Sequence, residues 1–328
     1  MFVAAPYAFS NQGSVLALTG SALSWSSVGY VSPATGGFPN YGAGLSASGN
    51  TAITAGYPSS SVLVWAFTKS GVNWFQQGSA FSPPNFASLG YFPKDAVALD
   101  GTTFVAGGPF GATVYSTAGG AGIPLTPAEY TPGLSGGGFG SPAAISGNTI
   151  IVHGSPTDSQ GQAAHWGYVF VKSGSTWVQQ ARLIPDDLPT NSGPAFRFSI
   201  AVQGDIAVLA TTFGAYVFQR SGTTWTQTQK LVPPIADNLF GGKAAFSGNL
   251  LVIGAANNVG GFGEAYVYGL SNKTFILGPT LKGANSGAPD SYGASVGVSN
   301  GVVAVGAPGA TVGTKSSQGQ VYVYACKP

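Results

Sequence analysis

Apolar and small or polar residues alternate over short runs throughout the chain, and this pattern repeats. The clearest copy begins at Tyr292-Gly293 with a short alternating segment that ends in the turn 299–301. An apolar run then stops at Gly306-Ala307-Pro308, and alternating valine and tyrosine follow at 321–324. A two-residue period in short segments rich in β-branched residues predicts strands, and no helical period is present. Because the pattern returns about every fifty residues, we expect a repeat protein.

Each repeat predicts the same strand order. Ser-Gly-Asn, Asp-Gly and Asn-Gly turns separate the first two strands, as at 48–50 and 146–148, and are signals for two-residue hairpins. A fourth strand begins at an aromatic residue after a second turn, as at Trp74 and Trp225, and Ser24-Trp25 is a degenerate copy of that start. The expected units span residues 1-33, 41-84, 92-132, 139-185, 196-234, 240-283 and 292-328. Seven units of four antiparallel strands predict an all-β chain, a single seven-bladed β-propeller domain over residues 1-328.

The two terminal units are expected to be incomplete. Unit one starts at its second strand, near Phe2, and unit seven stops after its third strand, near Tyr324. The innermost strand of the first unit and the outermost strand of the last are therefore missing from the pattern. We expect either that the natural chain extends further, which the unpaired inner edge favours, or that another molecule supplies a strand.

The aromatic–Gly start, the Val-Gly-Ala-Pro stop and the Gly-x-Val-Tyr-Val-Tyr strand resemble FG-GAP repeats. Residues 292–324 match best, whereas 92–132 and 196–234 are degenerate. The resemblance implies the seven-bladed propeller of integrin α-subunits and of some fungal lectins. Many members of that family bind calcium through an Asp-rich loop between the first two strands. Here that place is a bare hairpin without the carboxylates that calcium needs, so we expect no metal and no cofactor.

Composition narrows the function classes. Only 7% of the 328 residues are charged, against about 25% in ordinary soluble proteins, and the net charge of +2 is scattered. We therefore expect no nucleic-acid partner. No apolar run is long enough for a membrane span, and no signal peptide is visible in this chain. The single cysteine, Cys326, cannot form an intrachain disulfide, and we expect an exposed position that permits pairing between chains.

The fourth unit holds the richest set of candidate binding residues. We expect an exposed Trp166 beside carboxylates to form a sugar platform, because the ring stacks on C–H faces while acids accept hydroxyl hydrogen bonds. The alternative is that Trp166 packs a long loop against the core. The candidate ligand-binding residues are Trp166, His165, Asp158, Asp186, Asp187 and Arg197.

Other aromatic residues and the second histidine are expected to be structural. Trp65 aligns with the tyrosines that recur on third strands, such as Tyr216 and Tyr266, so we expect it in the core. A tryptophan also recurs at the start of fourth strands, at Trp74, Trp177 and Trp225, and we expect it to pack the blades. His153 lies on a second strand and is expected to be a satisfied core histidine.

Support for catalysis is thin, since two histidines limit acid–base schemes and no nucleophile elbow is present. A polysaccharide lyase that uses His165, Tyr168 and Arg197 is the enzymatic alternative.

The sequence thus predicts a non-enzymatic propeller, extracellular or at the cell surface. Its partners are expected to be copies of itself, in an oligomer or filament, or surface glycans and glycoproteins. Low charge favours the structural or adhesive subunit, because surfaces without charge repulsion pack readily against one another. The residues around Trp166 favour a lectin-like module instead.

Overall fold

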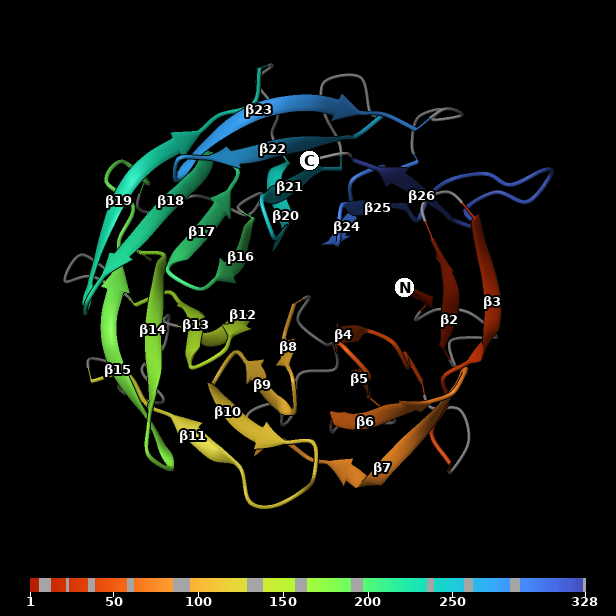
Figure 1. Ribbon diagram of the computed structural model, residues 1–328, viewed down its shortest axis with the longest axis horizontal. Helices are drawn as coiled ribbons and strands as arrows, with labels where there is room; N and C mark the ends of the chain where they lie inside the picture. Colours follow the sequence, from red (N-terminus) through yellow and green to blue (C-terminus); the bar gives the residue numbers. More distant parts are fainter. Residues whose placement is uncertain are drawn as a thin grey trace. The chain divides into compact units, whose positions relative to one another are not determined.

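The computed structural model consists of β-strands joined by turns and loops (Figure 1). It describes residues 1–5, 13–21, 24–34, 39–57, 62–84, 95–128, 138–156, 164–189, 197–234, 239–256, 262–283 and 290–326. By packing, the chain divides into two compact units, Met1–Arg182 and Leu183–Pro328, which are called unit 1 and unit 2 and treated separately. Among the residues described, no helix is long and apolar enough to cross a membrane.

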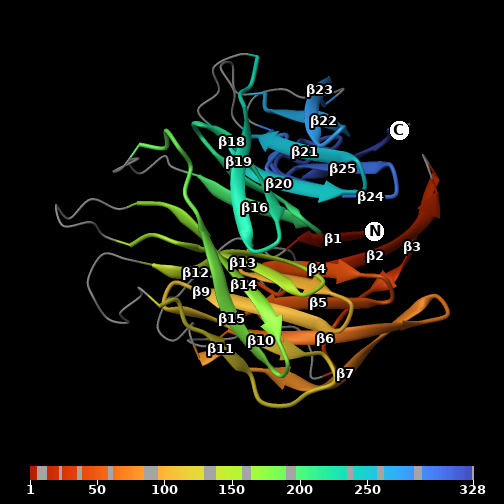
Figure 2. The ribbon, with the colours of Figure 1, turned by 60° about the vertical axis from the view of Figure 1, so that its left-hand side comes forward.

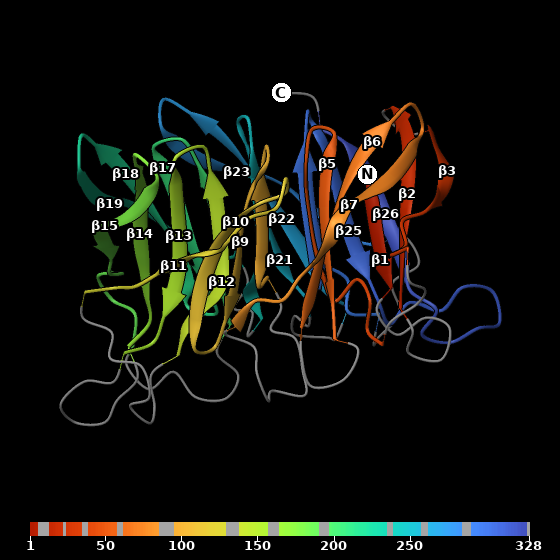
Figure 3. The same cartoon turned by 90° about the horizontal axis from the view of Figure 1, so that it is seen from below.

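Unit 1 contains four sheets built from consecutive strands. The strands of the first two sheets are β1 (Phe2–Ala5), β2 (Ser14–Ser21), β3 (Ser24–Tyr30), β4 (Gly44–Ser48), β5 (Thr51–Gly56), β6 (Leu63–Ser70) and β7 (Asn73–Phe81). The next two hold β8 (Val97–Asp100), β9 (Thr103–Gly108), β10 (Gly111–Ser116), β11 (Ile123–Leu125), β12 (Phe139–Ser146), β13 (Thr149–Gly154), β14 (Trp166–Ser173) and β15 (Thr176–Leu183). Figure 3 shows β12 and β13 side by side, joined by a tight turn.

Unit 2 contains three sheets of the same kind. Its strands are β16 (Phe198–Gln203), β17 (Ile206–Thr211), β18 (Gly214–Ser221), β19 (Thr224–Leu231), β20 (Phe240–Ser247), β21 (Leu250–Ala255), β22 (Glu264–Ser271), β23 (Thr274–Leu281), β24 (Ser295–Ser299), β25 (Val302–Ala307) and β26 (Gln320–Ala325).

The predicted fold class is confirmed: the chain has the fold of a seven-bladed β-propeller. Its 26 described strands form seven antiparallel sheets in chain order. Five sheets have four strands, whereas β1–β2–β3 and β24–β25–β26 have three, as expected from the two ends of the sequence pattern. The predicted hairpins are also confirmed, and Gly147 and Gly248 adopt the positive φ that such turns require. The single-domain boundary remains a prediction.

The aromatic residue that starts a repeat fills the space between its own sheet and the preceding one. Phe240 is fully buried with Val217 and Leu231 of the preceding sheet, and Tyr292 is buried with Val252 and Val267 in the same way. Each of these rings also meets an aromatic ring on the third strand of its own sheet edge to face. The pairs are Tyr41–Trp65 at 5.5 Å between ring centroids, Phe139–Tyr168 at 5.5 Å, Phe240–Tyr266 at 5.6 Å and Tyr292–Tyr322 at 5.2 Å. The two aromatic positions of the repeat therefore form one packing unit.

The glycine after that aromatic residue lets the backbone touch the preceding sheet. Gly293 has a φ of 89°, and a methyl group built there would overlap the carbonyl oxygen of Glu264. Gly241 is placed in the same way against Thr211, and Gly140 against Gly108. The aromatic–Gly pair is thus a contact between neighbouring sheets, and only glycine permits it.

We predict that Gly293→Ala destabilises the chain by about 3 kcal/mol, because the added methyl group meets backbone atoms and φ is positive. Gly248→Ala is the matched control in unit 2: its φ is also positive, 63°, but nothing lies within 4 Å of the added atom. Only the cost of the left-handed conformation, about 1 kcal/mol, is expected there. Urea unfolding of both variants measures the difference, and equal losses would contradict the proposed role of the contact.

Candidate functional site

The only two histidines of the chain lie against each other in sheet β12–β15, whose outer strands Figure 2 brings forward. His153, on β13, places Nδ1 3.0 Å from the carbonyl oxygen of Ser141. Its Nε2 lies 3.1 Å from Nδ1 of His165, which precedes β14, and the two rings stack with centroids 5.3 Å apart. Because a carbonyl only accepts, His153 Nδ1 carries the proton and His153 Nε2 accepts from His165 Nδ1. His153 is therefore a hydrogen-bonded histidine, as predicted, and it is half-buried rather than fully enclosed in the core.

Both imidazoles are neutral near pH 7. Burial, with a smaller contribution from the neighbouring His165, lowers the pKa of His153 to about 3. Burial also lowers the pKa of His165 to about 4. No group of three or more His, Cys, Asp or Glu side chains that could hold a metal occurs in the described part of the chain. The two side chains thus form a hydrogen-bonded, stacked pair.

Trp166, the first residue of β14, is half-buried rather than the exposed platform that the sequence predicts. The guanidinium of Arg182 lies over its ring, 4.9 Å from the centroid. The ring also packs against the core cluster of Tyr168 and Phe139. The cation–π contact covers one face of the ring and core packing covers part of the rest, so less ring surface is exposed for a sugar than the sequence predicts.

Two of the predicted acidic residues, Asp186 and Asp187, lie in unit 2 on the segment that follows β15. The backbone N–H of Asp186 donates to Gln227 Oε1 at 3.1 Å, and Asp187 Oδ2 pairs with Lys230 Nζ at 2.6 Å. The hydrogen bond from Lys230 lowers the pKa of the Asp187 carboxyl. These contacts hold the segment on sheet β16–β19. Arg197 is exposed just before β16, and Asp158 lies outside the described residues.

A recurring glutamine, which the sequence patterns above do not predict, links each fourth strand to the segment that enters its sheet. Gln76, Gln179 and Gln227 each lie two residues after a fourth-strand tryptophan. Each side-chain oxygen accepts a backbone N–H from the segment that enters from the preceding sheet. The donors are Ala34 at 2.9 Å, Ala128 at 2.9 Å and Asp186 at 3.1 Å. The repeated Trp-x-Gln spacing was the available signal.

Four exposed apolar side chains of unit 2 each lie at the same end of their own sheet. Third strands begin and fourth strands end there, since strands in each sheet alternate in direction. We call these four residues the apolar rim: Phe213 (40% exposed), Val232 (58%), Phe262 (47%) and Val312 (43%). Tyr30 and Phe110 occupy the same end of their own sheets in unit 1 and are also exposed.

Two members of the rim are held by local hydrogen bonds. The backbone N–H of Phe213 donates to Thr211 Oγ1 at 3.0 Å, and this hydroxyl donates to the carbonyl of Gly214 at 3.0 Å. Val312 exchanges two backbone hydrogen bonds of 3.1 Å with Lys315. These side chains are presented from fixed turns, so little ordering cost opposes a contact through them.

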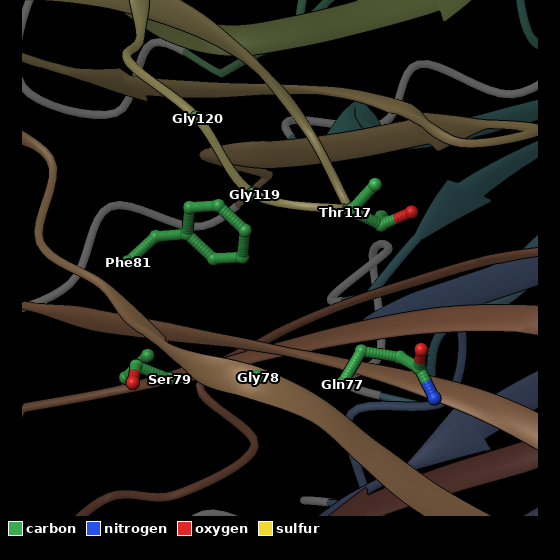
Figure 4. A pocket seen from close by; sticks show the side chains of 9 residues that line it. Gln77, Gly78, Ser79, Phe81, Thr117, Gly119 and Gly120 are labelled. Atoms are coloured by element: carbon green, nitrogen blue, oxygen red, sulfur yellow. The ribbon is translucent and has the colours of Figure 1, made fainter.

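A shallow cavity of about 290 Å³ lies between β7 and the turn after β10 in unit 1 (Figure 4). The Phe81 side chain points into this cavity, and Gln77 and Thr117 lie at its edge. Glycines form much of the remaining wall, so the cavity offers few side-chain groups that could orient a ligand.

The other predicted positions have these outcomes. Trp65 is 2% exposed, and Trp177 is buried in a core cluster, as expected. Tyr168, named for the lyase alternative, is 2% exposed and lies within the core. The expectation of an exposed Cys326 is wrong: it is half-buried, because it packs against the core of sheet β24–β26, and burial raises the pKa of its thiol.

Comparison with solved structures supports the fold. The β-propeller domain of Cps50 (Swd1) from Myceliophteria thermophila matches 97% of this chain and 92% of its own, with a TM-score of 0.55 and 10% identity. A prolyl endopeptidase matches 97% of this chain with a TM-score of 0.55 and 14% identity. The Hadza microbial sialidase Hz136 matches 87% with a TM-score of 0.51 and 12% identity. Neither a protein-family model nor a curated protein sequence matches.

These likenesses establish architecture alone. The matched region spans 44% of the prolyl endopeptidase chain and 65% of the sialidase chain. At such low identity, a shared propeller carries no information about chemistry, because one fold supports many activities.

We predict that the histidine pair makes the chain acid-sensitive. The unfolded chain binds protons near pH 6.5, whereas the folded pKa values are about 3 and about 4. Stability is therefore fully present above pH 6.5 and falls as pH drops below it, by up to about 1.4 kcal/mol per pH unit for His153 and by less for the partly exposed His165. Urea unfolding at pH 7 and pH 5 measures this slope. In His153→Asn/His165→Asn we expect a flatter slope, and an unchanged one would refute the assignment.

We predict that Trp166→Ala lowers the free energy of unfolding by about 2 kcal/mol, because the ring packs against the core. Arg182→Ala is the matched control, and removes only the cation–π contact, at about 0.5–1 kcal/mol. A glycan array on the same two proteins separates the roles. If the ring carried a sugar, Trp166→Ala would lose binding while Arg182→Ala, which uncovers the ring, would keep it.

Proposed function

We propose that this chain is a non-enzymatic propeller that binds protein surfaces, including other copies of itself, as a structural or adhesive subunit. The apolar rim carries this proposal. Phe213 and Phe262 are large and exposed at the same end of their own sheets, and the turn that carries Phe213 is fixed by hydrogen bonds. Clusters of exposed aromatic and aliphatic side chains mark protein interaction sites.

Low charge supports self-association. Twelve basic and ten acidic residues in 328 give a net charge of +2, so copies of the chain repel one another weakly. Several of these charges are also engaged within the chain, as in the pairs Arg220–Asp205 and Lys282–Glu264. An apolar rim on such a surface meets little electrostatic opposition when two copies approach.

We also propose that the protein is extracellular or at the cell surface and that its repeats are related to FG-GAP repeats. The repeat pattern of residues 292–324 supports that relationship, and the low charge suits a protein that works at a surface. The glycan-binding alternative is less favoured, since Arg182 covers one face of the Trp166 ring. The lyase alternative is less favoured because Tyr168 is buried.

Replacing the rim by Phe213→Ser/Phe262→Ser tests the proposal. Sedimentation velocity over a concentration series is expected to show association of the native chain beyond its 32.9 kDa monomer mass. We expect the double variant to weaken association at least tenfold, because two anchors typically carry about 1–2 kcal/mol each. Ile276→Ser, on the outer strand β23 and 60% exposed, is the control and should associate normally. A native chain that stays monomeric at about 100 µM, or a variant that associates equally, would overturn the proposal.

A further inference from the structure

The third strand of sheet β24–β25–β26 has a strand partner on one side only among the described residues. In the neighbouring four-stranded sheet β20–β21–β22–β23, β22 lies between β21 and β23, and Tyr266, Val267 and Tyr268 are at most 2% exposed. The aligned residues of β26, Tyr322, Val323 and Tyr324, are half-exposed. The side chains of β26 thus match a covered strand but lie at an open edge.

The direction of the unpaired backbone groups follows from the register. Cys326 donates its N–H to the carbonyl of Gly301 at 2.7 Å, so this is a hydrogen-bonded antiparallel pair. Hydrogen-bonded pairs alternate with non-bonded ones, and Tyr324 and Tyr322 therefore point their N–H and C=O groups toward β25. Val321, Val323 and Ala325 point theirs away from β25, along the open edge. Three residues thus offer donors and acceptors to a further strand.

Natural edges are usually blunted by lysine, proline or a bulge, and β26 carries none of these. Its sequence, Gln-Val-Tyr-Val-Tyr-Ala, is uncharged and alternates residues of high β propensity. It pairs with β25 without any register shift over its whole length. The edge is therefore regular and suited to pairing.

The other sheets show which sequence covers such a strand. β15, β19 and β23 each begin with threonine, continue with Trp or Phe, and end with leucine at the eighth position. β19 covers β18, whose Ala-Tyr-Val-Phe segment corresponds to Val-Tyr-Val-Tyr of β26. Both β19 and β23 cross their partners with a single irregularity at the same place, next to Val217 and Val267. The repeat thus defines the pattern Thr-(Trp/Phe)-x₅-Leu for an incoming strand.

We propose that the outer edge of β26 is a binding site for an extended polypeptide segment of this pattern, supplied by a partner molecule. The segment adds antiparallel to β26 and pairs with the backbone of Val321, Val323 and Ala325. Its aromatic residue packs beside Cys326, as Phe275 packs beside Leu270 in the neighbouring sheet. Main-chain hydrogen bonds supply affinity and the aromatic and leucine positions supply selectivity. The inference uses none of the apolar rim, so it stands or falls separately from the proposed function.

A synthetic peptide of residues 222–232, which contains β19, is the probe. Titrated into the full isotope-labelled chain, it should bind saturably with a dissociation constant below about 1 mM, that is, with more than about 4 kcal/mol of binding free energy. The amides of Val321, Val323 and Ala325 should become protected from hydrogen exchange. Those of Tyr322 and Tyr324, already bonded to β25, should change little. A peptide with serine in place of its tryptophan should bind at least tenfold more weakly.

Val323→Pro is the decisive variant, because it removes an N–H that points outward and keeps the hydrogen bonds to β25. We expect it to weaken peptide binding at least tenfold, while Val323→Ala, which keeps the N–H, weakens it far less. An unchanged unfolding midpoint confirms that either variant is folded, and should Val323→Pro fail to fold, the alternating protection pattern decides. The proposal would be overturned if the peptide did not bind up to about 1 mM, or if Val323→Pro left its binding unchanged. It would also be overturned if two copies of the chain paired through β26 and the peptide did not dissociate that dimer.

Discussion

The contact between an aromatic–Gly pair and the preceding sheet is the constraint on which the remaining structure depends. The ring of Tyr292 or Phe240 fills the space between two sheets, and the glycine after it allows backbone atoms to touch. A sheet that lost this contact would expose one apolar face, since its neighbour supplies the other half of each core cluster. Stability in such a repeat is therefore shared between neighbours rather than held by any one sheet.

The sequence predicted the strands well because each is specified by short-range signals. Positive-φ turns such as 299–301 fix the hairpins, and alternation fixes which residues face the core. Even the missing strands at the two ends followed from counting repeats. Contacts that depend on side-chain placement were not accessible. The pairing of His153 with His165 joins a strand to a loop end, and Arg182 reaches Trp166 from a different strand, so neither has a signature in the sequence.

The candidate site changed most between sequence and structure. Two residues that the sequence predicts to bind a ligand instead contact neighbouring side chains. Asp187 forms an ion pair with Lys230, and the Trp166 ring makes a cation–π contact with Arg182. Charged residues make up only 7% of the chain, and several of them are paired within it, as in Lys230–Asp187 and Arg220–Asp205. Apolar side chains at strand ends and backbone groups at an open edge are exposed in the described part of the chain. Groups of these two kinds can serve contacts between proteins.

Electron cryo-microscopy of the purified chain at high concentration tests the central claim most directly, because it locates the contact between copies. The account predicts assemblies in which neighbouring molecules meet through the sheet ends that carry Phe213 and Phe262. Assemblies joined through the opposite ends, where the hairpin turns such as Gly248 lie, would contradict it, as would isolated molecules at every concentration.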